Sequence, residues 1–254
     1  MRKWTLAALA LTFFSVALSA QTVDEIIAKN IQAHGGMAKL KSIQSIRMTG
    51  DFDAGGMQAG FTQVFKRPMK IRIEASIQGL TMIQAYDGQS GWQVIPFTGK
   101  KDAEPMAADD LKNFQEQADF DGPLVDYKQK GHKVELVGKE KVEGTNVYHL
   151  KVTLKNGDIV YDYLDPDTFI EIRREIQQFI RGSVRDRVVG LGSYKPVAGV
   201  MFPFSISQGP KNHPDEQTTT VQKMEVNVPI DPADFALPAS LKTEEKKSGM
   251  VGVH

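Results

Sequence analysis

Cysteine is absent from all 254 residues of the chain, and neither sign of charge is in excess. Without cysteine the chain can form no disulfide, no thiolate metal site and no cysteine nucleophile, and it has no cysteine for lipid attachment. The 31 basic and 31 acidic residues cancel, so electrostatics gives no reason to expect a nucleic acid as partner. Apolar residues make up 41% of the chain, which indicates a globular protein that folds by apolar burial.

Residues 1–20 have the pattern of a secretory signal peptide. Two basic residues precede an apolar run over residues 6–18, and small residues then come before the polar Gln21. We therefore expect cleavage after Ala20 and a periplasmic mature protein. An uncleaved membrane anchor is the alternative interpretation of this segment.

The remaining chain shows no low-complexity linker that would divide it into domains. We predict one domain over residues 21–240. Residues 241–254 are mostly polar, with glycine and lysine among them, and we expect them to form a flexible tail.

Helical spacing occurs near the start of this domain and once in its middle. Thr22 and Glu25 form a capping-box pattern, and apolar residues then follow at helical spacing until Gly35-Gly36. The pattern predicts a helix over residues 22–34, with a second short helix at 37–43. A third helix is predicted over residues 107–118, where apolar residues again recur every three or four positions.

Elsewhere the apolar pattern has a period of two, which is typical of strands with one buried and one solvated face. The dipeptide Asn156-Gly157 lies between two such runs and predicts a hairpin with a type I′ turn. About eleven or twelve strands are expected in all. They lie near residues 44–54, 57–67, 70–78, 80–87, 90–96, 132–141, 145–155, 158–164, 169–181, 184–195, 200–208 and 217–228.

These elements predict a mainly β (α+β) fold in which one wide antiparallel sheet curls into an incomplete barrel. Two or three short helices are too few to cover so many strands flatly, so we expect them to enclose an apolar cavity. A second interpretation is that the inward side chains simply fill the interior as core. The side chains expected to point inward are Met48, Phe61, Phe65, Ile71, Ile73, Met82 and Trp92.

The sequence contains no recognisable catalytic or metal-binding pattern. The five histidines are far apart, and no Gly-x-Ser-x-Gly segment is present. The segments Asp165-Pro166-Asp167 and Asp231-Pro232-Ala233-Asp234 are interpreted as turns, because they supply too few oxygen ligands for calcium. We therefore expect no enzymatic activity, no catalytic residues, no bound metal and no cofactor.

Four segments follow one another in an order that is typical of a known family. They are Lys66-Arg67-Pro68, then Asp87-Gly88 with Trp92 and Pro96, then Tyr163-Leu164-Asp165-Pro166, and finally Val226-Asn227-Val228-Pro229 with Phe235 and Pro238. Over about residues 22–240 the chain thereby resembles the LolA/LolB-like superfamily, the periplasmic carriers and receptors of outer-membrane lipoproteins. Within it, the chain looks most similar to the outer-membrane lipoprotein-sorting proteins.

The resemblance implies an incomplete barrel with helices as a lid over a hydrophobic cavity. It also implies a soluble carrier that binds acyl chains of lipids or lipoproteins for transfer toward the outer membrane. In the family's carrier the arginine of the Lys-Arg-Pro segment bonds the backbone of the lid and governs its opening, and Arg67 is the matching position. Its other interpretation is a solvated charge at a strand end.

The implied partners are an inner-membrane release complex and an outer-membrane receptor, and we expect a monomer. Two alternatives remain open. The first is a periplasmic sensor or interaction module that regulates an envelope-stress response without carrying lipid. The second is an enzyme acting on envelope lipids or glycans, which would need titratable groups that converge in the cavity.

Overall fold

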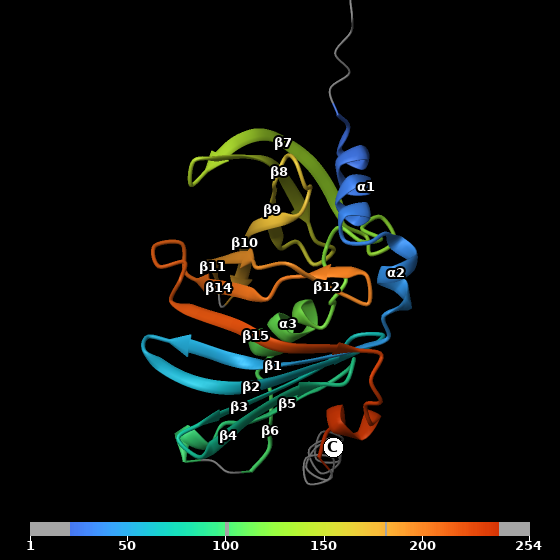
Figure 1. Ribbon diagram of the computed structural model, residues 1–254. Coiled ribbons are helices and arrows are strands. Elements are labelled where there is room, and N and C mark those ends of the chain that lie inside the picture. Colours follow the sequence, from blue (N-terminus) through green and yellow to red (C-terminus); the bar gives the residue numbers. More distant parts are fainter. Residues whose placement is uncertain (1–20, 100–101, 181, 239–254) are drawn as a thin grey trace, which may run out of the picture.

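The structure is a computed structural model that describes residues 21–99, 102–180 and 182–238 (Figure 1). The predicted signal peptide and the predicted tail at 241–254 lie outside the described residues. The helical elements of the described chain are α1 (Val23–Ala33), α2 (Met37–Ser42), α3 (Ala108–Gln117) and the 3-10 turns η1 (Pro96–Thr98) and η2 (Pro232–Phe235). The strands are β1 (Ser45–Ala54), β2 (Met57–Lys66), β3 (Lys70–Ile77), β4 (Leu80–Tyr86), β5 (Gly91–Val94), β6 (Glu104–Pro105), β7 (Lys133–Val142), β8 (Thr145–Thr153), β9 (Ile159–Leu164), β10 (Glu171–Ile180), β11 (Ser183–Gly192), β12 (Lys195–Val197), β13 (Val200–Phe202), β14 (Ser205–Gly209) and β15 (Gln217–Val226).

The first helix begins and ends where its capping residues dictate. The Thr22 hydroxyl accepts a hydrogen bond from the Glu25 amide, and the Glu25 carboxylate accepts one from the Thr22 amide, which completes the predicted capping box. The helix stops at His34, because Gly35 and Gly36 follow with φ angles of 109° and 90°. The predicted helices at 22–34, 37–43 and 107–118 are confirmed as α1, α2 and α3.

Thirteen strands form one antiparallel sheet in the order β6-β5-β4-β3-β2-β1-β15-β14-β11-β10-β9-β8-β7. The chain therefore starts in the middle of the sheet at β1 and runs by hairpins out to the β6 edge. It then crosses through α3 to the opposite edge at β7 and returns to β15, which pairs with β1. Two meanders thus meet at the β1–β15 pair.

The sheet curls around α3, and α1 and α2 lie along one side of the curve (Figure 1). The sheet has two edge strands, β6 and β7, so within the described residues it is not closed into a barrel. A wide sheet of twisted strands curls in this way because each strand is rotated relative to its neighbour. The predicted mainly β fold with an incomplete, helix-covered barrel is confirmed.

Two local expectations are wrong. The predicted strand at 200–208 is split into β13 and β14, because Pro203 lies between them and has no amide to donate to a ladder. β13 instead forms a separate hairpin with β12. The hairpin at Asn156-Gly157 is confirmed, but only Gly157 has a positive φ, so its turn is not type I′.

Two large apolar clusters fill the concave side of the sheet. The first lies over β1–β4 and includes Ile46, Phe65 and Ile71 together with Phe114 of α3. The second lies over β8–β10 and is covered by Ile26 and Ile27 of α1; its strand members are Tyr148, Leu150, Val152, Val160, Leu164 and Ile176. Each half of the curled sheet therefore has its own helical cover.

Candidate ligand-binding interior

The concave face of β1–β4 carries apolar side chains in cross-strand rows. Residues that lie directly opposite each other in an antiparallel pair share a face of the sheet. One row consists of Ile46, Phe65, Ile71 and Tyr86; the next of Met48, Gln63, Ile73 and Gln84; and the third of Gly50, Phe61, Ala75 and Met82. The structure therefore brings together six of the residues that were expected to point inward, namely Met48, Phe61, Phe65, Ile71, Ile73 and Met82.

The seventh expected residue, Trp92, lies on the opposite face. Trp92 pairs with Ala85, which in turn pairs with Arg72. These residues alternate with the concave ones along their strands, so they lie on the convex face. Its indole Nε1 donates to the Phe235 carbonyl at 3.1 Å, and its ring packs with Ala85 and Leu237. The segment around η2 covers the convex face here, and Trp92 is a core residue beneath it.

Helix α3 and the β12–β13 hairpin cover the apolar rows. Phe114 and Val200 join the cluster that contains Phe65 and Ile71. At the other end of the rows Phe204 packs against Phe61, with Met48 and Phe202 alongside. The interior predicted as a cavity is thus closed in this structure, because side chains of the cover fill it.

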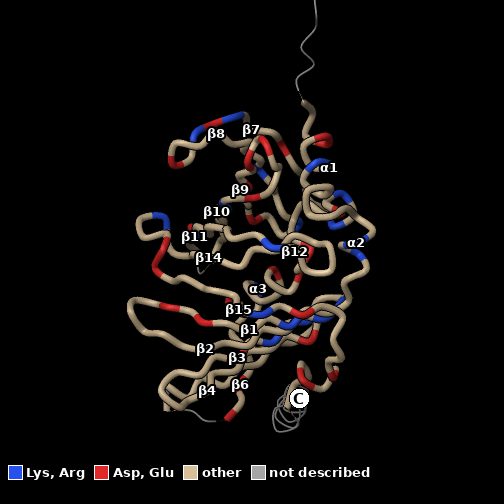
Figure 2. The backbone as a smooth tube through the Cα atoms, in the orientation of Figure 1, with Lys and Arg blue, Asp and Glu red and all other residues tan. Residues whose placement is uncertain are grey.

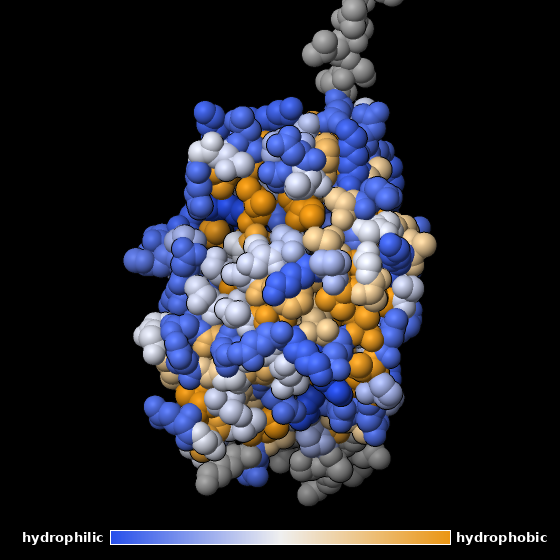
Figure 3. Space-filling model, viewed as in Figure 1, coloured by the Kyte–Doolittle hydropathy of each residue, from blue (hydrophilic) through white to orange (hydrophobic). Residues whose placement is uncertain are grey.

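Two surface hollows of the described chain lie outside this interior. One of about 870 Å³ lies where the C-terminal segment passes α2 and β2, and its lining includes Gln44, Lys66 and Ile230. The other, of about 400 Å³, is lined by residues of the β7–β8 hairpin and by Pro166. Figure 3 also shows apolar side chains gathered in a recess beneath the β7–β9 end of the molecule, with polar residues around it.

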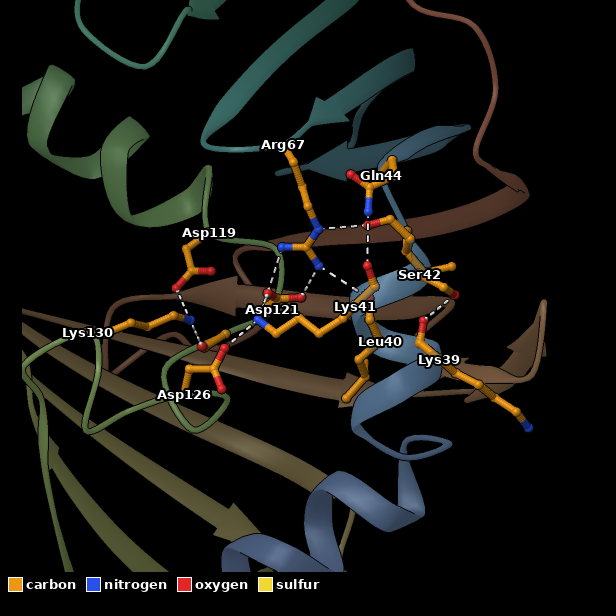
Figure 4. A network of polar contacts seen from close by, with 12 residues as sticks. Lys39, Leu40, Lys41, Ser42, Gln44, Arg67, Asp119, Asp121, Asp126 and Lys130 are labelled. Carbon is orange, nitrogen blue, oxygen red and sulfur yellow. Dashed lines mark hydrogen bonds and ion pairs between the residues drawn. The ribbon is translucent and has the colours of Figure 1, made fainter.

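Arg67 joins the sheet to the cover at the β2–β3 turn (Figure 4). Its Nε donates to the Ile43 carbonyl at 2.7 Å, and Nη2 donates to the Leu40 carbonyl at 3.2 Å, both at the C-terminal end of α2. Nη1 and Nη2 also bind the two carboxylate oxygens of Asp121 at 2.7 Å each. Its guanidinium lies 4.5 Å from the centre of the Phe120 ring. Arg67 is therefore a half-buried side chain with several hydrogen-bond partners and not a solvated strand-end charge.

Asp121 is held by two cations on the loop after α3. Its side chain is only 3% exposed, and Lys41 Nζ lies 2.9 Å from Oδ2 in addition to the Arg67 fork. Burial alone would raise the pKa of Asp121, but its hydrogen bonds with Arg67 and Lys41 outweigh burial and lower it. Lys41 also pairs with Asp126 at 2.6 Å. Arg67 and α2 are thus tied to the loop that follows α3.

A second set of buried charges ties α1 to β10 and to the β12–β13 hairpin. His34 Nε2 lies 2.6 Å from Glu171 Oε2, and Nδ1 lies 2.8 Å from the Met201 carbonyl. Burial alone would lower the pKa of His34, but the hydrogen bond and the charge of Glu171 outweigh it and raise the pKa. Arg174 pairs with the fully buried Asp162 at 2.6 Å nearby.

In the predicted strand at 169–181 the alternation of apolar Ile170 and Ile172 with Glu171 would put Glu171 on the solvated face, but the structure buries it. The ladder between β9 and β10 shifts register between Glu171 and Arg173, so the faces exchange at that bulge. Asp162 gave a better signal, because it lies inside an otherwise apolar and aromatic run from Ile159 to Leu164. Nothing in the sequence linked Asp121 to Arg67.

The described residues contain no group of three or more histidine, aspartate or glutamate side chains that could hold a metal ion. Among those same residues, no helix is long and apolar enough to cross a membrane. Basic and acidic residues alternate along the tube in Figure 2, and neither sign dominates one part of the molecule. The described part of the chain therefore has no region dominated by one sign of charge.

Solved structures with this architecture come from several bacteria. A LolA superfamily protein from Nitrosomonas europaea matches with a TM-score of 0.55 at 12% identity, covering 86% of this chain and 99% of that one. A DUF1329 family protein from Desulfovibrio piger matches with a TM-score of 0.55 at 13% identity, covering 84% and 97%. An outer-membrane lipoprotein-sorting protein domain from Vibrio parahaemolyticus matches with a TM-score of 0.52 at 9% identity, covering 83% and 94%.

No protein-family model matches the chain, and no curated protein matches its sequence. At identities of 9–13% the likeness concerns the fold. The chain has the fold of the LolA superfamily, an incomplete β-barrel with a helical cover, and this confirms the resemblance seen in the sequence.

Proposed function

We propose that this protein is a soluble periplasmic carrier that binds the acyl chains of lipids or lipoproteins and transfers them toward the outer membrane. The observation that carries the proposal is the set of apolar rows on the concave face of β1–β4, which α3 and the β12–β13 hairpin cover without joining the sheet ladder. An acyl chain exposed to water costs about 0.8 kcal/mol per CH₂, so a carrier must bury the whole chain.

In the proposed mechanism the cover moves away and the acyl chain takes its place on the apolar rows. Met48 and Met82 suit this exchange, because the methionine side chain adapts to guests of different shape. Phe61, Phe65, Ile71 and Ile73 complete the contact surface. Arg67 serves as the latch, because it holds the end of α2 and the loop after α3 in the closed position. An inner-membrane release complex would load the carrier and an outer-membrane receptor would unload it, and both steps would require the cover to open.

Bound lipid can be measured directly. The mature protein is purified from the periplasm and extracted with organic solvent, and the extract is identified and quantified by mass spectrometry. We expect acyl lipid or lipoprotein in amounts comparable to the protein. Met82→Gln, which adds a polar group to the contact surface at nearly constant volume, should lower the amount bound. Met69→Gln is the matched control, because Met69 is exposed in the β2–β3 turn.

Wild-type protein that carries no acyl chain, and that also fails to take one up from lipid vesicles, would exclude the carrier proposal. The filled interior favours a second candidate, an interaction module for a partner protein. That candidate predicts a periplasmic segment of a membrane protein in the purified complex and no extractable lipid. Equal lipid content in Met82→Gln and Met69→Gln would remove β4 from the contact surface.

A further inference from the structure

Between its two apolar clusters the concave face carries an arginine of β11. Arg187 lies directly opposite Ile176 of β10, Ile176 lies opposite Val160 of β9, and Val160 lies opposite Val152 of β8. These three partners are buried members of the cluster under α1. Arg187 therefore extends an apolar cross-strand row and shares its inward face.

Arg187 forms no ion pair with any of the described residues. Its Nε is buried without a hydrogen-bond partner, and no hydrogen bond or ion pair joins its side chain to the described chain. The other two interior arginines differ, because Arg174 pairs with Asp162 at 2.6 Å and Arg67 pairs with Asp121 at 2.7 Å. A half-buried cation without an ion pair is costly, and apolar packing around it offers no compensation for the charge.

The acid whose charge acts on Arg187 is Glu116, and its carboxyl group already has hydrogen-bond partners. Glu116 of α3 accepts hydrogen bonds from Gln178 at 2.7 Å and from Asn156 at 3.0 Å. Burial, together with a hydrogen bond to Asp158, raises the pKa of Glu116 to about 7. At neutral pH this carboxyl group is therefore protonated for much of the time and neutralises Arg187 only in part. Arg187 as a residue is half-buried, although its Nε is fully buried.

We propose that Arg187 binds the anionic head group, a carboxylate or a phosphate, of a lipid whose acyl chain lies on the apolar concave face. This inference rests on the proposed function, since it names the class of lipid that the interior accepts. A guanidinium offers a planar fork of donors that matches the oxygens of either anion. An amphiphile with one charged end requires an apolar surface next to a charge of opposite sign. The apolar rows of the concave face and Arg187 provide these two parts.

The experiment compares a charged lipid with its neutral ester. The delipidated mature protein is titrated with cis-parinaric acid and, separately, with methyl cis-parinarate, whose polyene fluoresces in an apolar site. We expect the wild type to bind the acid at least about ten-fold more tightly than the ester. Arg187→Gln should reduce this ratio to within about two-fold and leave ester binding unchanged. Arg187→Lys retains the charge and should retain part of the preference.

Arg185→Gln is the matched control, because Arg185 lies on the same strand and faces Gln178, two residues nearer the hairpin tip, where it is exposed. It should keep the full preference for the acid. Oleoyl lysophosphatidate as competitor tests the phosphate head group, and inorganic phosphate tests a free anion. We expect the lipid phosphate to compete and inorganic phosphate not to compete.

Equal binding of acid and ester by the wild type would overturn the head-group proposal and leave the carrier function standing. A preference that survives in Arg187→Gln would also overturn it, as would displacement by inorganic phosphate alone. Failure of the wild type to bind either probe would refute the carrier function itself. Circular dichroism establishes that each variant is folded. If Arg187→Gln does not fold, Arg187→Ala and Arg187→Lys replace it. An unchanged acid-to-ester ratio in Arg187→Ala, or a preference for the acid that is lost completely in Arg187→Lys, would then overturn the proposal.

Discussion

Replacing Arg67 by leucine removes the contacts that hold the cover against the sheet. The substitution deletes the double hydrogen bond to Asp121 and the two bonds to the Leu40 and Ile43 carbonyls. It also leaves the Asp121 side chain, only 3% exposed, with Lys41 as its remaining cation. The sheet register is untouched, because Arg67 lies just beyond the end of β2. The variant should therefore loosen α2 and the loop after α3 while the sheet stays folded.

The expected loss of stability in Arg67→Leu depends on how deeply the ion pair is buried and on the partner that Asp121 keeps, which is Lys41. Removing one partner of a buried ion pair costs about 3–5 kcal/mol. Lys41 still neutralises Asp121 at 2.9 Å, and the Arg67 side chain is 24% exposed, so part of this cost is avoided. We expect the free energy of unfolding to fall by about 2–3 kcal/mol in Arg67→Leu. Arg67→Lys should lie between, because lysine keeps the charge and loses the planar fork.

Urea denaturation of wild type, Arg67→Leu, Asp121→Asn and the double variant forms a double-mutant cycle for this pair. We expect a coupling energy of about 1.5–3 kcal/mol, together with faster hydrogen exchange in α2. Since the pKa of Asp121 is lowered, the contribution of the pair is present above the unfolded pKa of about 3.9 and is lost as pH falls through the folded value. A decrease in the free energy of unfolding below about 0.5 kcal/mol, or unchanged hydrogen exchange in α2, would refute the proposal that Arg67 acts as a latch.

Three further predictions concern the interior and the sheet. His34→Gln should remove a pH dependence of stability: the raised pKa beside Glu171 stabilises the fold below about 6.5, and this contribution is lost as pH rises through the folded value, which urea titrations at several pH values would show. For Glu116, whose pKa is raised to about 7 by burial and by Asp158, stability should fall as pH rises from its ordinary value of 4.5 toward 7; Glu116→Gln should flatten this fall, and an unchanged slope would contradict it. Gly50→Ala should lower the free energy of unfolding by roughly 1–3 kcal/mol in thermal or urea melts, since a Cβ there would lie 2.0 Å from a backbone oxygen of the facing strand.

Strand parity predicted most of the candidate interior. Met48, Phe61 and Ile73 each lie in a run where apolar and polar residues alternate, and one face of these runs is solvated along much of its length. A period of two then fixes which side chains share a face, whatever the partner strand is. For these positions the sequence contained the required information, although not which elements would cover them.

Trp92 shows where parity fails. β5 is only four residues long and residues on both of its faces are buried, so the run gives no reliable phase. Its convex face is covered by Phe235 and Leu237, which follow more than 140 positions later in the chain. A cover supplied by such a distant segment has no local signal, and the tryptophan was therefore assigned to the nearer, concave core.

The buried charges could not be predicted from the sequence for a different reason. A bulge exchanges the faces of β10 at Glu171, and one extra residue in a ladder leaves no trace in a run of alternating residues. Asp121 meets Arg67 across a separation of 54 positions in a turn whose composition is typical of any surface loop. Long-range ion pairs of this kind depend on the route of the chain, which periodicity does not encode.

The way in which the cover is attached bears on how a closed interior can serve a carrier. Backbone ladders hold the thirteen-stranded sheet together, whereas the cover is held by apolar packing and by a few polar contacts, among them Arg67 with Asp121, Lys112 with Asp158 at 2.7 Å and His34 with Glu171 at 2.6 Å. Opening therefore breaks these contacts and exposes the apolar rows without disturbing the ladders. In the proposed carrier, an acyl chain that takes the place of the cover would recover about 0.8 kcal/mol for each CH₂ that it buries on the apolar rows. In the proposed mechanism the closed and loaded states bury the same rows with different side chains or guests, so a change at the polar contacts would shift the balance between holding a lipid and releasing it.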